Sequence, residues 1–178
     1  MRKTQHGFSL AELLTAMAVI AILAGIAIPT LRQFSASSRT TAATNSLVTA
    51  LATARSEALR RSIPVSVCAS TDSQTCSGST TWNTGWIVFT DGSGTPGQLD
   101  GGSDVVLQAW NAPSGNMSVT SSTKYLRYDA RGMVWSQTTD YVFPVTFNTL
   151  PSGCKGKNQT KVSVTIGGSP QSIRLACP

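Results

Sequence analysis

Residues 8–28 read FSLAELLTAMAVIAILAGIAI, and this stretch decides how the rest of the chain is interpreted. Its 21 residues include one charged side chain, Glu12. An α-helix of this length, at about 1.5 Å per residue, extends over about 30 Å, the thickness of the hydrocarbon core of a bilayer. Arg2 and Lys3 precede it, and basic residues are typical of the cytoplasmic flank. The stretch predicts a transmembrane helix with its N-terminus in the cytoplasm.

A cleaved secretory signal is the alternative, because it too combines a basic start with an apolar core. Two features disfavour it. The apolar run is longer than such a core, and IPTLRQF follows it instead of an A-x-A cleavage site. We therefore expect the apolar segment to continue into a longer helix.

Glu12 is the most informative residue of this segment. A carboxylate within an apolar helix costs several kcal/mol unless it is paired or neutralised. Its side chain could extend to the membrane interface, but we favour pairing with a positive group of another protein. Gly7 and Phe8 stand just before it, in the string GFSLAE.

The sequence of residues 7–29 resembles the class III signal of type IV pilins and type II secretion pseudopilins. The resemblance implies that a prepilin peptidase cuts between Gly7 and Phe8 and methylates the new N-terminus at Phe8. It also implies that Glu12 pairs with the N-terminal ammonium of a neighbouring subunit, and that Pro29 kinks the helix. Each charge is costly alone in lipid, so their meeting favours assembly.

After Pro29 the apolar residues recur every three to five positions, which predicts an amphipathic helix over residues 29–63. Glu57 and Arg61 form an i,i+4 pair in the favourable order. Pro64 excludes the preceding residue from the α conformation and should end the helix. The apolar positions that we expect to pack on a sheet are Phe34, Ala43, Leu47, Leu51, Ala54 and Ala58.

Residues 64–178 are rich in short alternating runs separated by Gly, Pro, Asn and Asp, as in a β-rich globular domain. We expect an α+β protein with one antiparallel sheet, or two sheets, packed on the single helix. Pro144 suggests an edge position or a bulge. The predicted strands are Val65–Ala69, Trp86–Thr90, Val105–Trp110, Met117–Thr120, Tyr125–Asp129, Tyr141–Asn148, Val162–Ile166 and Ser172–Ala176.

Residues 45–68 (NSLVTALATARSEALRRSIPVSVC) and 82–94 (WNTGWIVFTDGSG) resemble the GspH/FimT branch of the pilin superfamily. The resemblance implies the pilin fold, with residues 1–7 as a cleaved leader and 8–28 as the transmembrane and assembly helix. It implies a minor pilin that primes assembly of a type IV pilus or forms part of its tip. The alternatives are the minor pseudopilin H of type II secretion and a DNA-binding minor pilin for natural transformation.

The same resemblance implies location and partners. The chain would cross the inner membrane once, with its C-terminal domain in the periplasm, and would then enter a pilus or pseudopilus. Its partners would be other pilin or pseudopilin subunits and the prepilin peptidase, with DNA as an open alternative and no small-molecule substrate.

Histidine and cysteine limit the chemistry. The only histidine, His6, lies in the predicted leader, so Ser-His-Asp and Cys-His catalysis are excluded and we expect no enzyme, metal or cofactor. The four cysteines show no CxxC spacing and, in an exported domain, should form disulfides. Of three possible pairings we favour Cys68–Cys76 and Cys154–Cys177, because each closes a short loop.

Two polar regions could bind ligands. The glycine-rich loop TDGSGTPGQLDGGSD (90–104) carries Asp91, Asp100 and Asp104, and calcium binding is the alternative to the favoured solvated hairpin loop. It lacks the D-x-[DN]-x-[DN]-G spacing. Basic residues form one group at Lys124, Arg127 and Arg131 and another in the C-terminal hairpin, at Lys155, Lys157, Lys161 and Arg174.

The hairpin group could contact DNA phosphates. FimT-type pilins that capture DNA carry a C-terminal G-R-x-R motif, whereas GSPQSIR stands here and keeps only Arg174. A solvated basic surface is therefore favoured. The tryptophans are expected in the core or at its rim and not as base-stacking platforms; they are Trp82, Trp86, Trp110 and Trp135.

Overall fold

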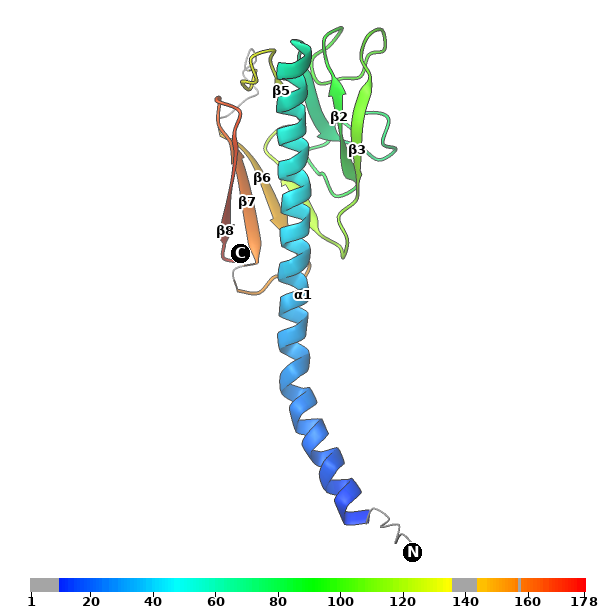
Figure 1. Ribbon diagram of the computed structural model, residues 1–178, viewed down its shortest axis with the longest axis vertical. Coiled ribbons are helices and arrows are strands. Elements are labelled where there is room, and N and C mark those ends of the chain that lie inside the picture. The colour runs from blue at the N-terminus through cyan, green and yellow to red at the C-terminus, as the bar shows by residue number, and fades with distance from the viewer. Residues whose placement is uncertain (1–9, 136–143, 157) are drawn as a thin grey trace, which may run out of the picture. The chain divides into compact units, whose positions relative to one another are not determined.

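The computed structural model describes residues 10–135, 144–156 and 158–178. The described chain consists of one long helix followed by eight strands (Figure 1). It divides into two compact units, Met1–Ser35 and Ala36–Pro178, and the helix contributes to both. The second unit is an α+β domain, as predicted, and it contains all of the strands.

Helix α1 extends over Leu10–Arg61. It ends two residues before the predicted boundary at residue 63, because Ser62 adopts a φ of 55°. A residue in the left-handed region just after the last helical residue is a common way to end a helix. The chain has thus left the helix before Pro64 is reached.

The strands form two four-stranded antiparallel sheets, which settles the choice between one sheet and two. Their orders are β3-β2-β1-β5 and β4-β6-β7-β8. The bounds are β1 Val65–Ala69, β2 Gly85–Thr90, β3 Val106–Asn111, β4 Ser118–Ser121, β5 Tyr125–Tyr128, β6 Val145–Leu150, β7 Gln159–Val164 and β8 Pro170–Leu175.

Two sequence predictions about strands are wrong. Pro144 lies just before β6 and not within it, and β6 is a central strand, which a proline inside it would disrupt. Residues 141–143, predicted in the same strand, lie outside the described residues. The β7–β8 pairing runs from Gln159 opposite Leu175 to Val164 opposite Pro170, so Ile166 lies in the turn and not in a strand.

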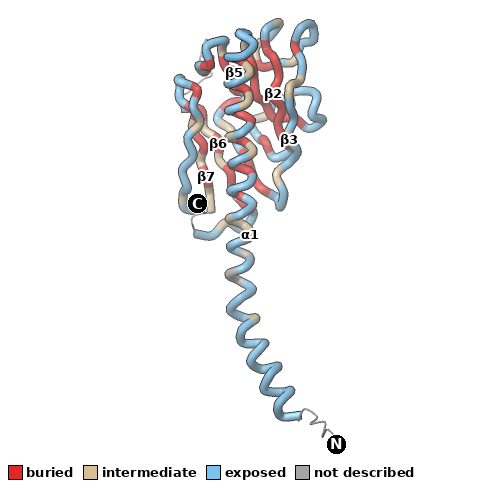
Figure 2. Tube along the Cα trace, viewed as in Figure 1, coloured by how far each residue is buried: buried red, intermediate tan, exposed pale blue. Residues whose placement is uncertain are grey.

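One apolar core joins the helix to both sheets. Within the second unit α1 lies across the two sheets, and the residues on the strands behind it are mostly buried (Figures 1 and 2). Phe34 is not part of this core, contrary to the prediction, because 70% of its surface is exposed. The helix contributes Leu47, Ala50, Leu51, Ala54 and Ala58, and the sheets supply most of the other members, including Val67, Val88, Leu126, Val119, Phe147 and Val162.

A smaller apolar cluster covers the opposite face of the first sheet. Cys68, Ile87 and Phe89 form its buried centre, with Leu99 and Tyr125 packed against them. Both faces of β1 and β2 are therefore buried over their whole length. The four cysteines pair as Cys68–Cys76 and Cys154–Cys177, the local pairing favoured by the sequence.

Hydrogen bonds connect α1 to loops from both sheets. Arg55 Nε donates to the carbonyl oxygen of Gly132 over 3.0 Å, and its Nη1 donates to Ser169 Oγ over 2.7 Å. Tyr128 donates its hydroxyl proton to the carbonyl oxygen of Gly168 over 3.2 Å, and burial raises the pKa of this phenol. The hydroxyl therefore remains a donor at any physiological pH.

Substitution of Gly168 tests the close packing of these two loops. The φ of Gly168 is 80°, and an added Cβ would clash with the carbonyl oxygen of Gly132. We expect Gly168→Ala to lower the free energy of unfolding by more than about 2 kcal/mol, because backbone strain and the clash add. Gly78→Ala is the matched control, since Gly78 also has a positive φ (66°) but no neighbour within 4 Å.

The control should lose only about 1–2 kcal/mol, the strain of the left-handed conformation alone. Denaturant unfolding of the full-length protein in detergent measures both. Equal losses in the two variants would show that the close approach of Gly168 to Gly132 does not matter for stability.

Candidate functional site

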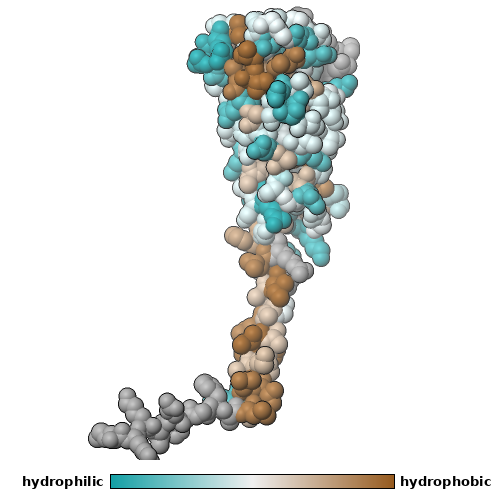
Figure 3. Space-filling view, turned by 90° about the vertical axis from the view of Figure 1, so that its right-hand side faces the viewer, coloured by the Kyte–Doolittle hydropathy of each residue, from teal (hydrophilic) through white to brown (hydrophobic). Residues whose placement is uncertain are grey.

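The most prominent surface of the first unit is apolar. Figure 3 shows apolar side chains covering this part of α1, and among the described residues this helix alone is long and apolar enough to cross a membrane. A shallow apolar hollow is lined by Leu23, Ile26, Ala27, Leu31 and Phe34. Large exposed side chains occur along the whole segment, including Leu10, Leu14, Met17, Ile20, Ile22, Ile26 and Ile28.

Glu12 lies near the start of the described part of α1. Its residue is exposed, and its backbone carbonyl accepts a hydrogen bond from Thr15 Oγ1 over 2.9 Å. Gly7 and Phe8, the predicted cleavage and methylation residues, lie outside the described residues. The role of Glu12 in assembly stays a prediction.

Pro29 is part of α1, which continues on both sides of it. Proline has no N–H group, so the carbonyl oxygen of Gly25 lacks its usual helical donor. The local conditions for a bend are present, and the kink at Pro29 stays a prediction.

The C-terminal basic residues do not share one face. Lys161 lies opposite Ile173, whereas Arg174 lies opposite the buried Thr160, so the two basic side chains are on opposite faces of the β7–β8 pair. Arg174 Nη2 donates to Thr41 Oγ1 of α1 over 3.1 Å. Lys155 is exposed in the loop before β7, and Lys157 lies outside the described residues. The described residues form no single basic surface in this hairpin.

The second basic group is also divided. Arg127 is 12% exposed and its Nε lies 3.0 Å from Asp91 Oδ2, while its Nη2 donates to the Asp91 carbonyl oxygen over 2.7 Å. It also stacks on the ring of Trp135, with its guanidinium carbon 4.6 Å from the ring centre. Arg131 instead is 82% exposed and pairs with Asp129. Arg127 thus has a structural role that its position in the sequence did not indicate.

Asp91 is the centre of a buried polar cluster. None of it is exposed, and its Oδ2 accepts hydrogen bonds from Ser66 Oγ (2.5 Å) and the Gly97 N–H (2.9 Å). Burial raises the pKa of its carboxyl, and the neighbouring Asp104 adds to this, whereas the donors and Arg127 oppose it. Ser66 and Arg127 lie opposite one another on β1 and β5. Strand pairing brings these distant residues together, and no local sequence pattern predicts it.

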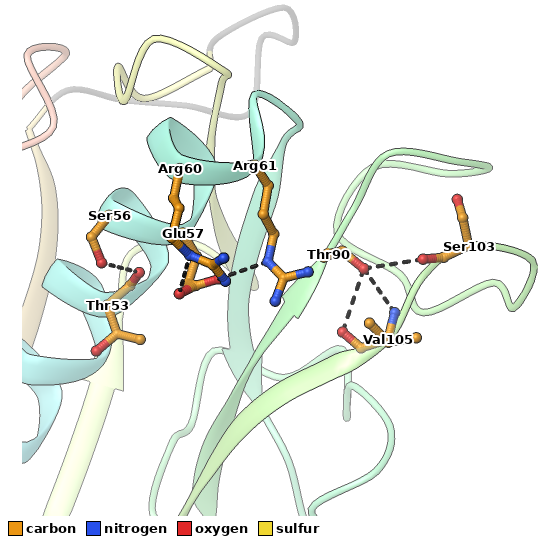
Figure 4. Close-up of polar contacts among 8 residues, drawn as sticks. All are labelled: Thr53, Ser56, Glu57, Arg60, Arg61, Thr90, Ser103 and Val105. Carbon is orange, nitrogen blue, oxygen red and sulfur yellow. Dashed lines mark hydrogen bonds and ion pairs between the residues drawn. The ribbon is translucent and has the colours of Figure 1, made fainter.

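At the end of α1 a second ionic cluster is exposed. Glu57 accepts hydrogen bonds from Arg60 and Arg61, with 2.6 Å contacts to both guanidinium groups (Figure 4). The hydrogen bonds from Arg60 and then Arg61 lower the pKa of Glu57 to about 2. The predicted pair of Glu57 with Arg61 is present, with Arg60 as an additional partner.

The tryptophans are mostly core residues. Trp82 and Trp86 are buried, and the rings of Trp82 and Phe147 pack edge to face with centres 5.0 Å apart. Trp110 is half-buried against the main core. They are therefore poor platforms for stacking bases.

A long helix that is apolar in its first part and packed on antiparallel sheets in its second defines a pilin-like fold. The family described as Type II transport protein GspH matches residues 43–169, and the Prokaryotic N-terminal methylation motif matches residues 2–28. The chain belongs to the GspH family. No curated protein matches the chain significantly.

Solved structures agree on the fold. The type IV minor pilin FimU of Pseudomonas aeruginosa PAO1 matches in its P65 crystal form with a TM-score of 0.54 and 20% identity, covering 75% of this chain and 91% of FimU. Its P21 form matches with a TM-score of 0.51 and 18% identity, covering 84% and 91%.

We predict that Arg127→Gln is strongly destabilising, because it leaves the buried Asp91 carboxylate without its cation. Removal of one partner of a buried pair costs about 3–5 kcal/mol. The loss should shrink as the pH falls towards the raised pKa of Asp91, since a protonated carboxyl needs no cation.

Arg131→Gln is the control and should cost at most about 1 kcal/mol, as expected for an exposed pair. Thermal unfolding between pH 4 and pH 8 measures both variants. A loss for Arg127→Gln that does not depend on pH would contradict this account.

Proposed function

We propose that this protein is a non-catalytic minor pilin of a type IV pilus, which primes assembly or forms part of the pilus tip. The observation that carries the proposal is the exposed apolar part of α1, which includes the one charged residue Glu12. Such a surface requires lipid or the helices of other subunits around it. The methylation motif over residues 2–28 supports processing of the same segment.

The minor pseudopilin of type II secretion is the second candidate, because the description of the matching family names that pathway. Both candidates use the same anchor and the same mode of assembly. Deletion of the gene distinguishes them: loss of surface pili with normal protein secretion supports the pilin, and the reverse result supports the pseudopilin.

DNA binding is less favoured. The DNA-binding hypothesis requires a shared basic surface in the C-terminal hairpin, whereas Lys161 and Arg174 lie on opposite faces of that hairpin. A catalytic function also lacks support, since the one histidine of the chain is His6 and the described acidic side chains serve structural contacts at Asp91, Asp129 and Glu57.

Processing can be tested at Gly7. We expect Gly7→Val to accumulate as the full-length precursor and to stay out of filaments, because a Cβ and branched side chain hinder close approach of the backbone in a peptidase site. Mass spectrometry of the purified protein shows whether residues 1–7 are present. An intact Met1 in the mature wild-type protein would overturn the proposed cleavage.

Assembly can be tested at Glu12. We expect Glu12→Gln to insert into the membrane at the wild-type level but to enter filaments poorly, because the charge partner of the neighbouring N-terminus is lost. Glu57→Gln is the matched control, since it removes the same charge from the exposed end of the same helix.

Immunoblots of sheared filaments and of membrane fractions give both quantities for the two variants. Recovery of Glu12→Gln in filaments at the level of Glu57→Gln would disprove the pairing role of Glu12.

A further inference from the structure

The loop between β2 and β3 is not simply solvated, as the sequence had suggested. Asp91 is fully buried and Asp104 is 6% exposed, whereas Asp100 is exposed. The two buried acids stand at the two ends of the loop, one where the chain leaves β2 and one where it approaches β3. Burial of two carboxylates in one loop needs a physical explanation.

The base of the loop is closed by hydrogen bonds that bring its two ends together. Thr90 Oγ1 accepts a hydrogen bond from the Val105 N–H over 2.8 Å and faces the carbonyl oxygens of Ser103 and Val105 (Figure 4). Asp104 Oδ1 accepts hydrogen bonds from the N–H groups of Gly92 (3.0 Å) and Ser93 (3.3 Å). Asp104 is thereby attached to the residue that directly follows Asp91.

Each carboxylate is satisfied on one oxygen only. Asp91 Oδ2 accepts hydrogen bonds from Ser66 Oγ and the Gly97 N–H and lies beside the Arg127 guanidinium group. Asp91 Oδ1 is buried without a hydrogen-bond partner. Asp104 Oδ1 accepts hydrogen bonds from two backbone N–H groups, while its Oδ2 is likewise buried without a hydrogen-bond partner. Buried acceptors without a partner are rare, and an ion or an ordered water can satisfy them.

The charges of the cluster do not balance. Arg127 offsets Asp91, and the structure shows no ion pair for Asp104 among the residues it describes. Asp104 is therefore a buried carboxyl group without a cationic partner among the described residues, and a bound cation would supply one.

We propose that Asp91 Oδ1 and Asp104 Oδ2 bind a hard divalent cation of the calcium type at the base of the β2–β3 loop. Calcium prefers oxygen ligands and accepts carbonyl groups and water beside carboxylates, in flexible geometry. No group of three or more acidic, histidine or cysteine side chains suited to a metal occurs in the described part of the chain, so two carboxylates are the only charged ligands.

The small number of charged ligands determines the strength of binding. With two carboxylates and an arginine nearby, affinity should lie in the range of weak extracellular calcium sites, about 10⁻⁴–10⁻³ M. Magnesium should bind less well, because it demands near-ideal octahedral geometry and gives up its water reluctantly. The bound cation would tie the β2–β3 loop to β1 through Ser66 and to β5 through Arg127.

The test uses full-length protein in detergent, first treated with a chelator and then titrated with CaCl₂ at constant ionic strength. We expect about 10 mM Ca²⁺ to raise the Tm by about 3–6 °C, as follows from a dissociation constant of about 1 mM. Asp104→Asn should abolish the shift but still fold, since an amide oxygen can accept the same two N–H groups. Asp100→Asn is the matched control and should keep the shift.

A second measurement detects the ion directly. Tb³⁺, a luminescent substitute for Ca²⁺, should be sensitised by the nearby ring of Tyr125, which packs against Gly97. Ca²⁺ should displace the signal, and Asp104→Asn should lack it. The proposal is overturned if Ca²⁺ leaves the wild-type Tm unchanged, if Mg²⁺ gives the same shift, or if Asp104→Asn retains the wild-type response.

Discussion

The burial of one apolar stripe of α1 between two sheets is the interaction on which the rest of the structure depends. Leu47, Leu51 and Ala54 have no exposed surface, and they belong to the same core as strand residues from both sheets. Among the described residues α1 is the one helix, and its buried stripe shares a single core with residues of both sheets, so the helix joins the two sheets into one domain.

Polar groups around this core hold individual loops in position. Arg55 fastens the helix to the loops at Gly132 and Ser169, and Arg127 holds the end of β2 through Asp91. Both arginines use planar guanidinium groups to satisfy more than one acceptor, which lysine could not do in the same way. Their contribution is to fix where the loops lie and not to supply the main driving force of folding.

The two units of the chain meet different physical demands. The second unit buries its apolar side chains within itself, whereas the first exposes nearly all of its own. An exposed apolar helix of this kind needs an apolar environment around it. That requirement agrees with the proposed filament function, in which Glu12 would meet a charged partner from a neighbouring subunit.

The sequence by itself determined the features that depend on local pattern: the apolar segment, the amphipathic stripe, most strand positions, and the two disulfides between cysteines near in sequence. Tertiary structure alone decided which charges are buried and which faces they share. Asp91 and Arg127 are 36 residues apart and meet because β1 pairs with both β2 and β5. Lys161 and Arg174 are separated because a one-residue difference in register places side chains on opposite faces of a sheet. Such pairings are long-range, and no local pattern encodes them.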